Sequence, residues 1–510
     1  MMALTPGRPP RLGDRDDLVI LAVAASVILL FVAAEVRIAN GFGLPLDDSW
    51  IHLRFAENLA TGRGFAINPG NPVAGSTAPL WTLGLALARA LGVPALAAAK
   101  GLGVAGYAAT GLLTRRLVLA LGLGRGLGLA AGVAVVGSAR LAWGALSGME
   151  VPLAAALVAA GALLTARRQP LGAAATFGLA ALARPEALLL VALHVAGAGR
   201  LRAALARAAV ATLALVPALA FNVATVGRLV PATAIAKVEG GLLGQLVGVG
   251  EAWRFTGTRS LEYLREWGRV LLADHVALPV LAVIGLAVLR RSPLRWLGYA
   301  LVLHPVAMAV LAPYRGPAFQ TGRYSSHLLP LAVGLAVAGL GALLASLPRR
   351  GGLAAGLVAV LALGLLLPLA PASREYAWGV QNINAMQVRL GHWVAQHTPP
   401  AAWIAVNDVG ALAYFGDRRI IDLMGLVTPE IVPYRRRGPE GVLRYLERAC
   451  PDYLVIFPRW FPDLAARPDL FQPLERVHLA SNVVAGADEM VVYETAWNRW
   501  RPLPAPCARD

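Results

Sequence analysis

The sequence predicts an all-α polytopic membrane bundle of about eleven transmembrane helices, followed by an external α/β soluble domain. Two observations lead to this fold class. Of the 510 residues, 57% are hydrophobic and only 15% are charged, whereas a typical soluble domain is roughly 25% charged. The long apolar runs stop near Pro371, and shorter β-branched and aromatic runs follow. The composition excludes a soluble enzyme and a disordered chain.

The transmembrane spans are predicted from apolar runs, because a helix needs about 20 such residues to cross a bilayer. The candidate spans are residues 18–38, 97–114, 126–143, 150–166, 170–183, 186–199, 206–225, 275–290, 296–313, 326–347 and 353–371. Pro79 to Ala90 is apolar but only about a dozen residues long, so we expect an interfacial or re-entrant helix there.

The arginines orient these spans. Cytoplasmic loops are enriched in Lys and Arg, and with the N-terminus inside, every paired cluster between spans is cytoplasmic. The clusters are Arg115, Arg116 and Arg125; Arg167 and Arg168; Arg200, Arg202 and Arg207; Arg290, Arg291 and Arg295; and Arg349 and Arg350. Much of the net charge of +17 is therefore a signal of topology, and we expect no nucleic-acid partner.

The chain accordingly divides into three parts. Residues 1–17 form a cytoplasmic tail, residues 18–373 form the transmembrane module, and residues 374–510 form a periplasmic or extracellular α/β domain. The external loops of the module are residues 39–96, 226–274 and 314–325. In the last part, residues 382–397 have helical periodicity, and residues 402–406, 419–423, 453–457 and 489–494 are typical of strands. Cys450 and Cys507 lie there too, either paired or as two free thiols.

The densest group of polar residues follows the first span. Asp47 and Asp48 precede a segment that contains His52 and Arg54. If residues 48–60 are helical, Asp48 and His52 share one face. Ionisable residues next to the membrane are costly and are functional candidates, so we expect a site here. The alternative interpretation is that the adjacent carboxylates cap an interfacial helix.

Further candidates lie at the external ends of other spans. Arg184 and Glu186 could neutralise each other, and each basic residue could anchor the chain at the lipid headgroups. Taken together, however, these residues predict an external face on which carboxylates and cations converge. The candidates are Glu150, Arg184, Lys237, Arg323, Tyr324 and His327.

This combination of residue types suggests a group transfer. A carboxylate can act as a general base toward an attacking hydroxyl, and Arg and Lys can stabilise the charge on a departing phosphate. The sequence contains no Gly-rich phosphate loop, and nucleotide sugars are not expected outside the cytoplasmic membrane. A lipid-linked donor satisfies both constraints.

The segment from Leu46 to Gly64 reads LDDSWIHLRFAENLATGRG, and here the sequence resembles the GT-C superfamily. The similarity is greatest to bacterial membrane glycosyltransferases that use polyprenyl-phosphate sugars, including mycobacterial terminal arabinofuranosyltransferases and protein-mannosyltransferase-like proteins. It continues through residues 68–70, 75–82, 147–150, 183–186, 231–237, 322–324, 409–410 and 421–426. None of these motifs selects a sugar.

The resemblance implies an inverting transfer from a polyprenyl-phosphate sugar to a glycan, lipid or protein acceptor, in a bacterial plasma membrane whose lipids surround the bundle. It makes Asp48 or Asp47 the base and leaves open which. Arg54 would lie near the substrate, Lys237 and Arg323 would hold the phosphate, and Glu150 and Arg184 would line the cavity. Tyr324, His52 and His327 complete the candidate substrate-binding residues. We find no Asp-x-Asp pair of the kind that metal-dependent members use, so we expect no obligate metal and no other cofactor.

Two other functions are weaker. A transporter or flippase of lipid-linked sugars would be expected to contain internal repeats, and we find none. A glycan receptor would not need eleven spans as an anchor, and it would leave the aspartates without a role.

Overall fold

The structure is a computed structural model that describes residues 13–238, 241–246, 257–312, 315–346, 351–499 and 507. Arg349, Arg350 and the beginning of the predicted loop 314–325 lie outside the described residues. The chain forms two compact units. Unit 1 comprises Met1–Ala34, Lys100–Ala218 and Glu239–Arg374, and unit 2 comprises Glu35–Ala99, Leu219–Val238 and Glu375–Asp510.

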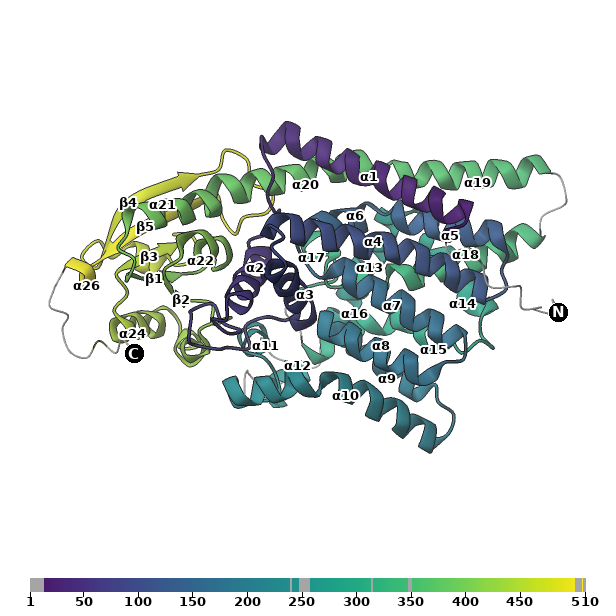
Figure 1. Cartoon of the computed structure of the whole chain (residues 1–510), viewed down its shortest axis with the longest axis horizontal. Coiled ribbons are helices and arrows are strands. Elements are labelled where there is room, and N and C mark those ends of the chain that lie inside the picture. The colour runs from purple at the N-terminus through teal and green to yellow at the C-terminus, as the bar shows by residue number, and fades with distance from the viewer. Residues whose placement is uncertain are drawn as a thin grey trace. The chain divides into compact units, whose positions relative to one another are not determined.

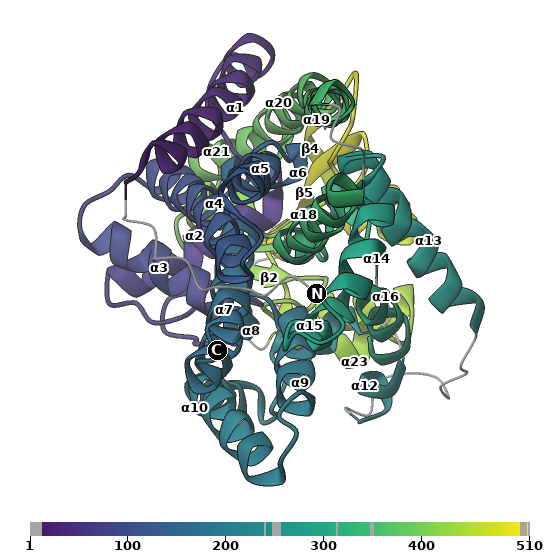
Figure 2. The same cartoon turned by 90° about the vertical axis from the view of Figure 1, so that its right-hand side faces the viewer.

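Unit 1 is helical (Figures 1 and 2). Its helices, some of which continue into unit 2, are α1 (Arg15–Ala39), α4 (Ala95–Ala120), α5 (Arg125–Val136), α6 (Ala139–Leu146), α7 (Val151–Ala166), α8 (Pro170–Ala183), η1 (Pro185–Ala187), α9 (Leu188–Ala196), α10 (Leu201–Val226), α12 (Gly241–Leu246), α13 (Gly257–Asp274), α14 (Leu278–Val288), α15 (Arg295–Gly298), α16 (Ala300–Leu311), α17 (Phe319–Gly322), η2 (Ser326–Leu328), α18 (Leu329–Ser346) and α19 (Gly351–Leu366). In both views α7, α8 and α9 lie side by side.

Each predicted apolar run contains a helix, but the count of eleven spans is not confirmed. Four helical stretches among the described residues are long and apolar enough to cross a membrane, namely α1, α4, α10 and Phe319–Ser346. The number rises to six if each of two bent pairs, α5 with α6 and α13 with α14, forms one span. The remaining apolar helices α7, α8, α9 and α16 are too short for the same criterion.

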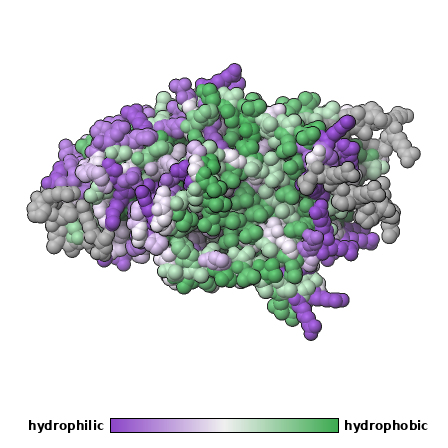
Figure 3. Space-filling model, viewed as in Figure 1, coloured by the Kyte–Doolittle hydropathy of each residue, from purple (hydrophilic) through white to green (hydrophobic). Residues whose placement is uncertain are grey.

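The surface of unit 1 fits a membrane protein. A broad region of hydrophobic residues extends across its helices in Figure 3, and exposed examples are Leu29, Leu213 and Leu363. Inside the unit, α14 and α18 approach closely at Gly285 and Gly339, because a Cβ atom at either position would collide with the backbone of the other helix. Small residues commonly permit such close contact between membrane helices.

Some of the basic residues assigned to the cytoplasmic side also have carboxylate partners. The buried Arg115 guanidinium contacts Asp14 and Asp17 at 2.7 Å and Asp16 at 3.0 Å. Arg125 adds a second contact to Asp16 at 2.7 Å. These ion pairs connect the start of α1 to α4 and α5, so the arginines there also have a structural role.

Unit 2 combines the segment after α1 with the C-terminal part of the chain. Its elements are α2 (Asp47–Ala60), α3 (Pro79–Ala90), α11 (Ala232–Lys237), α20 (Leu369–Ile383), the π-helical turn η3 (Asn384–Val388), α21 (Arg389–His397), β1 (Trp403–Val406), α22 (Gly410–Gly416), β2 (Arg419–Asp422), η4 (Pro429–Ile431), α23 (Val432–Arg435), α24 (Pro439–Ala449), β3 (Tyr453–Ile456), α25 (Pro462–Ala465), β4 (Phe471–His478), β5 (Glu489–Thr495) and α26 (Ala496–Arg499). The predicted short helix at residues 79–90 is confirmed as α3.

The sheet of unit 2 has the strand order β2-β1-β3-β5-β4 (Figure 1). β1 is parallel to β2 and to β3, and β5 is antiparallel to β3 and β4. The four predicted strands all form. β4 was not predicted, because it is an edge strand, mostly exposed and interrupted by Pro473 at a register shift, which hides the alternating pattern.

One hydrophobic core joins the distant segments of unit 2. Ile51 and Phe55 of α2 belong to the same buried cluster as Ile404 and Val406 of β1, together with Leu412 of α22. The opposite face of the sheet packs separately against α24 and α25. The burial of apolar side chains therefore fixes α2 against the C-terminal sheet and its helices.

Cys450 and Cys507 are joined by a disulfide bond with a Cα–Cα distance of 5.6 Å. The sequence had left this pairing open. The bond connects the end of α24 to residue 507, beyond α26.

Candidate functional site

Asp47, the first residue of α2, is committed to contacts within the protein. One carboxylate oxygen accepts the backbone N–H of Gly410 at 2.7 Å, and the other accepts that of Ala411 at 2.8 Å. A Cβ atom at Gly410 would collide with the Asp47 backbone, so glycine is required for this contact. Asp47 therefore joins α2 to the first turn of α22, a role that differs from the expected cap of its own helix.

Asp48 has a different environment from its neighbour. Its side chain is half-buried, whereas Asp47 is 7% exposed. Burial and the negative charges of Asp408 and Asp48 raise the pKa of Asp47, and the two N–H bonds oppose that rise. Of the two adjacent aspartates, Asp48 is the more accessible to a ligand.

A third carboxylate, Asp408, acts on the pKa of Asp47 but was not predicted as a candidate from the sequence. It follows β1 and is half-buried, and Gln387 Nε2 donates to its Oδ2 at 2.8 Å. Burial raises the pKa of Asp408 to about 7, and the charges of Asp48 and Asp422 contribute to the rise. Its position directly after a buried parallel strand was the available signal, because ligands bind at the carboxyl ends of such strands.

Asp422, at the end of β2, is a structural carboxylate. It accepts the backbone N–H groups of Met424 at 2.8 Å, Leu426 at 2.5 Å and Val427 at 3.0 Å. Burial raises the pKa of Asp422 to about 6, and these hydrogen bonds oppose the rise. The residue thus orders the loop that follows β2.

His52 and Arg54, both predicted to be near the substrate, contact protein groups in unit 2. His52 Nδ1 lies 3.0 Å from Thr82 Oγ1 and 3.2 Å from Ser76 Oγ. The Arg54 guanidinium forms an ion pair with Asp417 at 2.8 Å. Because both side chains are about 95% buried, these contacts position α2 within the unit.

Lys237 ends the short helix α11 and is half-buried. The helix is fixed by its backbone. The Ala232 N–H donates to Ala74 O at 3.0 Å, and Arg435 Nη2 donates to Ala236 O at 2.6 Å. The structure therefore presents Lys237 from a fixed segment of unit 2.

The other predicted residues form a buried cluster in unit 1. Arg184 forms ion pairs with Glu150 and with Glu186, the latter at 3.2 Å. The Arg184 guanidinium lies 4.9 Å from the centre of the Tyr324 ring, and that of Arg323 lies 5.1 Å from it. The pairing of Arg184 with Glu186, which the sequence left open as an alternative, is observed, and Glu150 is a second partner.

Two histidines adjoin this cluster. His304 Nε2 lies 2.9 Å from Ser325 Oγ, and the rings of His304 and His327 are 5.4 Å apart. His304 was not predicted, because an isolated histidine in an apolar helix gives no pattern that distinguishes a site from a core position. Of the predicted residues, Asp47, Asp48, His52, Arg54 and Lys237 belong to unit 2, and Glu150, Arg184, Arg323, Tyr324 and His327 belong to unit 1.

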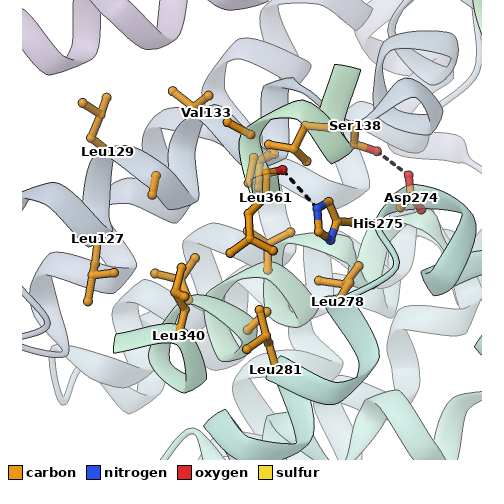
Figure 4. Close-up of a pocket in the computed structure, with 18 of the residues that line it drawn as sticks. Leu127, Leu129, Val133, Ser138, Asp274, His275, Leu278, Leu281, Leu340 and Leu361 are labelled. Atoms are coloured by element: carbon orange, nitrogen blue, oxygen red, sulfur yellow. Dashed lines mark hydrogen bonds between the residues drawn. The ribbon is translucent and has the colours of Figure 1, made fainter. Parts of the chain in front are cut away.

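Unit 1 also contains an apolar cavity of about 610 Å³ between α5, α14, α18 and α19 (Figure 4). Its walls are formed by side chains such as Val133, Leu281 and Leu340, and Ser138, Asp274 and His275 gather at one end. Ser138 Oγ donates to Asp274 Oδ1 at 2.9 Å. A cavity with this lining can hold an apolar chain.

No metal site is formed by the part of the chain that the structure describes, because no three His, Cys, Asp or Glu side chains there are arranged to hold an ion. The expectation that no metal is required is not tested by this arrangement.

Comparisons with known proteins establish the fold. A family model described as a domain of unknown function (DUF8728) matches residues 381–500, and no curated protein matches the sequence. The Archaeoglobus fulgidus oligosaccharyltransferase with a tethered acceptor peptide is 11% identical over 86% of this chain and 69% of that chain, with a TM-score of 0.53. This chain has the fold of that enzyme.

Two further structures are similar. The Archaeoglobus fulgidus oligosaccharyltransferase AglB with an inhibitory peptide and a dolichol-phosphate is 12% identical over 96% of this chain and 75% of that chain, with a TM-score of 0.50. ArnT from Cupriavidus metallidurans bound to undecaprenyl phosphate is 15% identical over 93% of this chain and 97% of that chain, with a TM-score of 0.49. The oligosaccharyltransferase fold agrees with the GT-C resemblance, whereas the narrower likeness to mycobacterial families is not confirmed.

Proposed function

We propose that this protein is an inverting glycosyltransferase that moves a sugar from a polyprenyl-phosphate donor to an external hydroxyl, with Asp48 as the general base. The observation that carries the proposal is the contrast between the adjacent aspartates. Asp47 binds two backbone N–H groups, while Asp48 next to it is half-buried. A fixed neighbour and an accessible carboxylate together suit a base that must meet a substrate.

The proposed reaction forms one bond and breaks one. The acceptor oxygen attacks the anomeric carbon of the sugar as its proton passes to the Asp48 carboxylate. The bond from the anomeric carbon to the phosphate oxygen breaks on the opposite side, and the prenyl phosphate leaves with the electron pair. Attack from the face opposite the leaving group inverts the configuration.

The leaving phosphate requires a cation, and we assign Lys237 to it, because the fixed helix α11 presents this residue in the same unit as Asp48. Arg323 lies beside Tyr324 in unit 1, where we assign Glu150 and Arg184 to the support of the buried cluster. Because Arg184 is paired with two carboxylates, its charge serves that cluster more than a ligand.

The prenyl chain requires an apolar surface, and we assign part of it to the cavity between α5, α14, α18 and α19. Its lining is hydrophobic apart from the polar residues at one end (Figure 4). An archaeal oligosaccharyltransferase of the same fold was solved with a dolichol-phosphate, which supports a lipid-linked donor here.

We place the protein in a bacterial plasma membrane, with residues 374–510 on the periplasmic or extracellular side. The disulfide between Cys450 and Cys507 supports this side, because disulfides persist in oxidising compartments. Labelling of a tag at residue 510 in intact spheroplasts tests the orientation, and labelling only after permeabilisation would contradict it.

The decisive experiment supplies the purified chain in lipid nanodiscs with a panel of polyprenyl-phosphate sugars and acceptors. We expect release of prenyl phosphate with one donor, and a product of inverted configuration. A parallel reaction with EDTA should retain activity, because we expect no obligate metal. Movement of an intact donor across a vesicle membrane without its cleavage would instead indicate a flippase.

A further inference from the structure

The connections of the unit 2 sheet diverge at the carboxyl ends of β1 and β3. These two strands are parallel neighbours, and the chain leaves them toward opposite faces. After β1 it enters α22, whose Leu412 packs on the same face as Ile404. After β3 it enters α25, whose Leu464 packs on the other face with Ala405. In open α/β sheets, ligands bind at the point where neighbouring connections diverge in this way.

The residues at this point carry polar groups with unused bonding capacity. Asn407 follows β1, and its Oδ1 accepts the N–H of Phe457, which follows β3, at 3.0 Å. Among the described residues, Asn407 Nδ2 and Gln387 Oε1 have no hydrogen-bond partner, although the two side chains are 3% and 0% exposed. A buried polar group without a hydrogen bond destabilises the fold, and a bound ligand or water would remove that cost.

Gln387 reaches this point through an irregular helix. Residues Asn384–Val388 form a π-helical turn between α20 and α21, and such turns occur often at functional sites. Gln387 lies in this turn and donates to Asp408 at 2.8 Å. Asp408 as a whole residue is half-buried, and this hydrogen bond fixes its carboxylate.

We propose that Asp408, positioned by Gln387 and Asn407, binds the hydroxyl groups of a carbohydrate acceptor. This inference rests on the proposed function and names the acceptor class. Each hydroxyl both donates and accepts hydrogen bonds. The Asp408 carboxylate and Gln387 Oε1 can accept such bonds, and Asn407 Nδ2 can donate one.

The position of Asp408 next to the start of α2 indicates the acceptor. Asp47 accepts the backbone N–H groups of Gly410 and Ala411, so the chain just after Asp408 contacts the residue beside Asp48, the proposed base. The base must contact the attacking hydroxyl, so a group bound beside it carries that hydroxyl or its neighbours on the same ring. A sugar with adjacent hydroxyls satisfies both carboxylates at once.

The test compares Asp408→Asn with Asp463→Asn, an exposed carboxylate of α25 in the same unit. With the active donor, we expect Asp408→Asn to raise the KM for the glycan acceptor at least tenfold, leave the KM for the donor unchanged and retain slow hydrolysis of the donor by water. Asp463→Asn should leave all three unchanged. Gln387→Ala should also raise the acceptor KM. Gln387→Glu should not restore the wild-type KM, because its carboxylate would then face that of Asp408.

A binding measurement separates this inference from the proposed reaction. Saturation-transfer NMR on the full chain without donor would use methyl mannoside, methyl galactoside and methyl arabinofuranoside as probes, with a Ser- and Lys-containing peptide as competitor. Glycoside signals that Asp408→Asn abolishes and Asp463→Asn retains would support the subsite, even if no donor is turned over. Binding of the peptide alone, or an Asp408→Asn effect on donor KM instead of acceptor KM, would overturn it.

Discussion

Exchanging each of the two adjacent aspartates for asparagine should damage the protein in opposite ways. In Asp47→Asn, the single amide oxygen can accept only one of the N–H groups of Gly410 and Ala411, which now bind two different oxygens at 2.7 and 2.8 Å. The amide NH₂ group then faces the other N–H. One backbone N–H group thus loses its acceptor and faces another donor, which should lower the free energy of unfolding by about 1–3 kcal/mol.

The thermal shift follows from the size of the unit. In domains of 150–250 residues, 1 kcal/mol corresponds to roughly 2–4 °C in Tm, so Asp47→Asn should lower the Tm by roughly 2–12 °C. Its kcat, measured well below the Tm, should fall by less than about tenfold, because the proposed base is retained.

Asp48→Asn should have the converse effect. A general base typically contributes about 10²–10⁴ in rate, so kcat should fall by that factor. Its Tm should be unchanged or higher, because the substitution removes a negative charge that acts on Asp47 and Asp408. Release of prenyl phosphate and differential scanning fluorimetry measure the two effects on the same samples, with Asp463→Asn as the unaffected control.

Two results would refute this reasoning. Full activity in Asp48→Asn would exclude Asp48 as the base. A folded Asp47→Asn variant that lost as much kcat as Asp48→Asn would assign the chemistry to Asp47 or to the pair.

Four further outcomes are expected. Lys237→Ala should raise the donor KM about tenfold or more through loss of a charged hydrogen bond, measured by donor titration, and an unchanged KM would remove Lys237 from the phosphate. Val133→Trp should fill the apolar cavity and raise the KM for a long prenyl donor more than for a short-chain analogue, whereas equal effects would argue against a chain there. The pKa of Asp422 is raised from 3.8 to about 6, so between these pH values the folded chain keeps a proton that the unfolded chain loses. The free energy of unfolding should therefore fall by about 3 kcal/mol as the pH rises through this range. The Tm of Asp422→Asn should depend less steeply on pH than that of the wild type. The disulfide closes a loop with a sequence separation of 57, worth about 4 kcal/mol, so a reductant should lower the Tm of the wild type but not of Cys507→Ser, and an insensitive wild type would contradict the bond.

Local patterns predicted the elements of the fold well. Apolar runs located the helices of unit 1, and β-branched runs located β1, β2, β3 and β5, because periodicity and composition are local properties. The number of spans did not follow in the same way. Short helices such as α7 and α8 and the bends between α5 and α6 depend on packing, which an apolar run does not specify.

The candidate site was predictable only in part. Asp47 and Asp48 stand out because two carboxylates follow a membrane span. Asp408 does not, since a single aspartate after a short strand is common in loops and becomes significant only beside Gln387 and Asp48. His304 was missed for the same reason, because its relation to His327 joins two different helices.

The sequence by itself determined that this is a membrane protein with a C-terminal α/β region, because partition into lipid depends on composition and on the placement of arginines along the chain. The tertiary structure decided how the two adjacent aspartates differ in exposure, because Asp47 is buried and Asp48 is half-buried. Asp47 is occupied by the N–H group of a glycine 363 positions later, and hydrogen bonding between such distant residues exists only after the apolar faces of α2, α22 and the sheet have packed into one core.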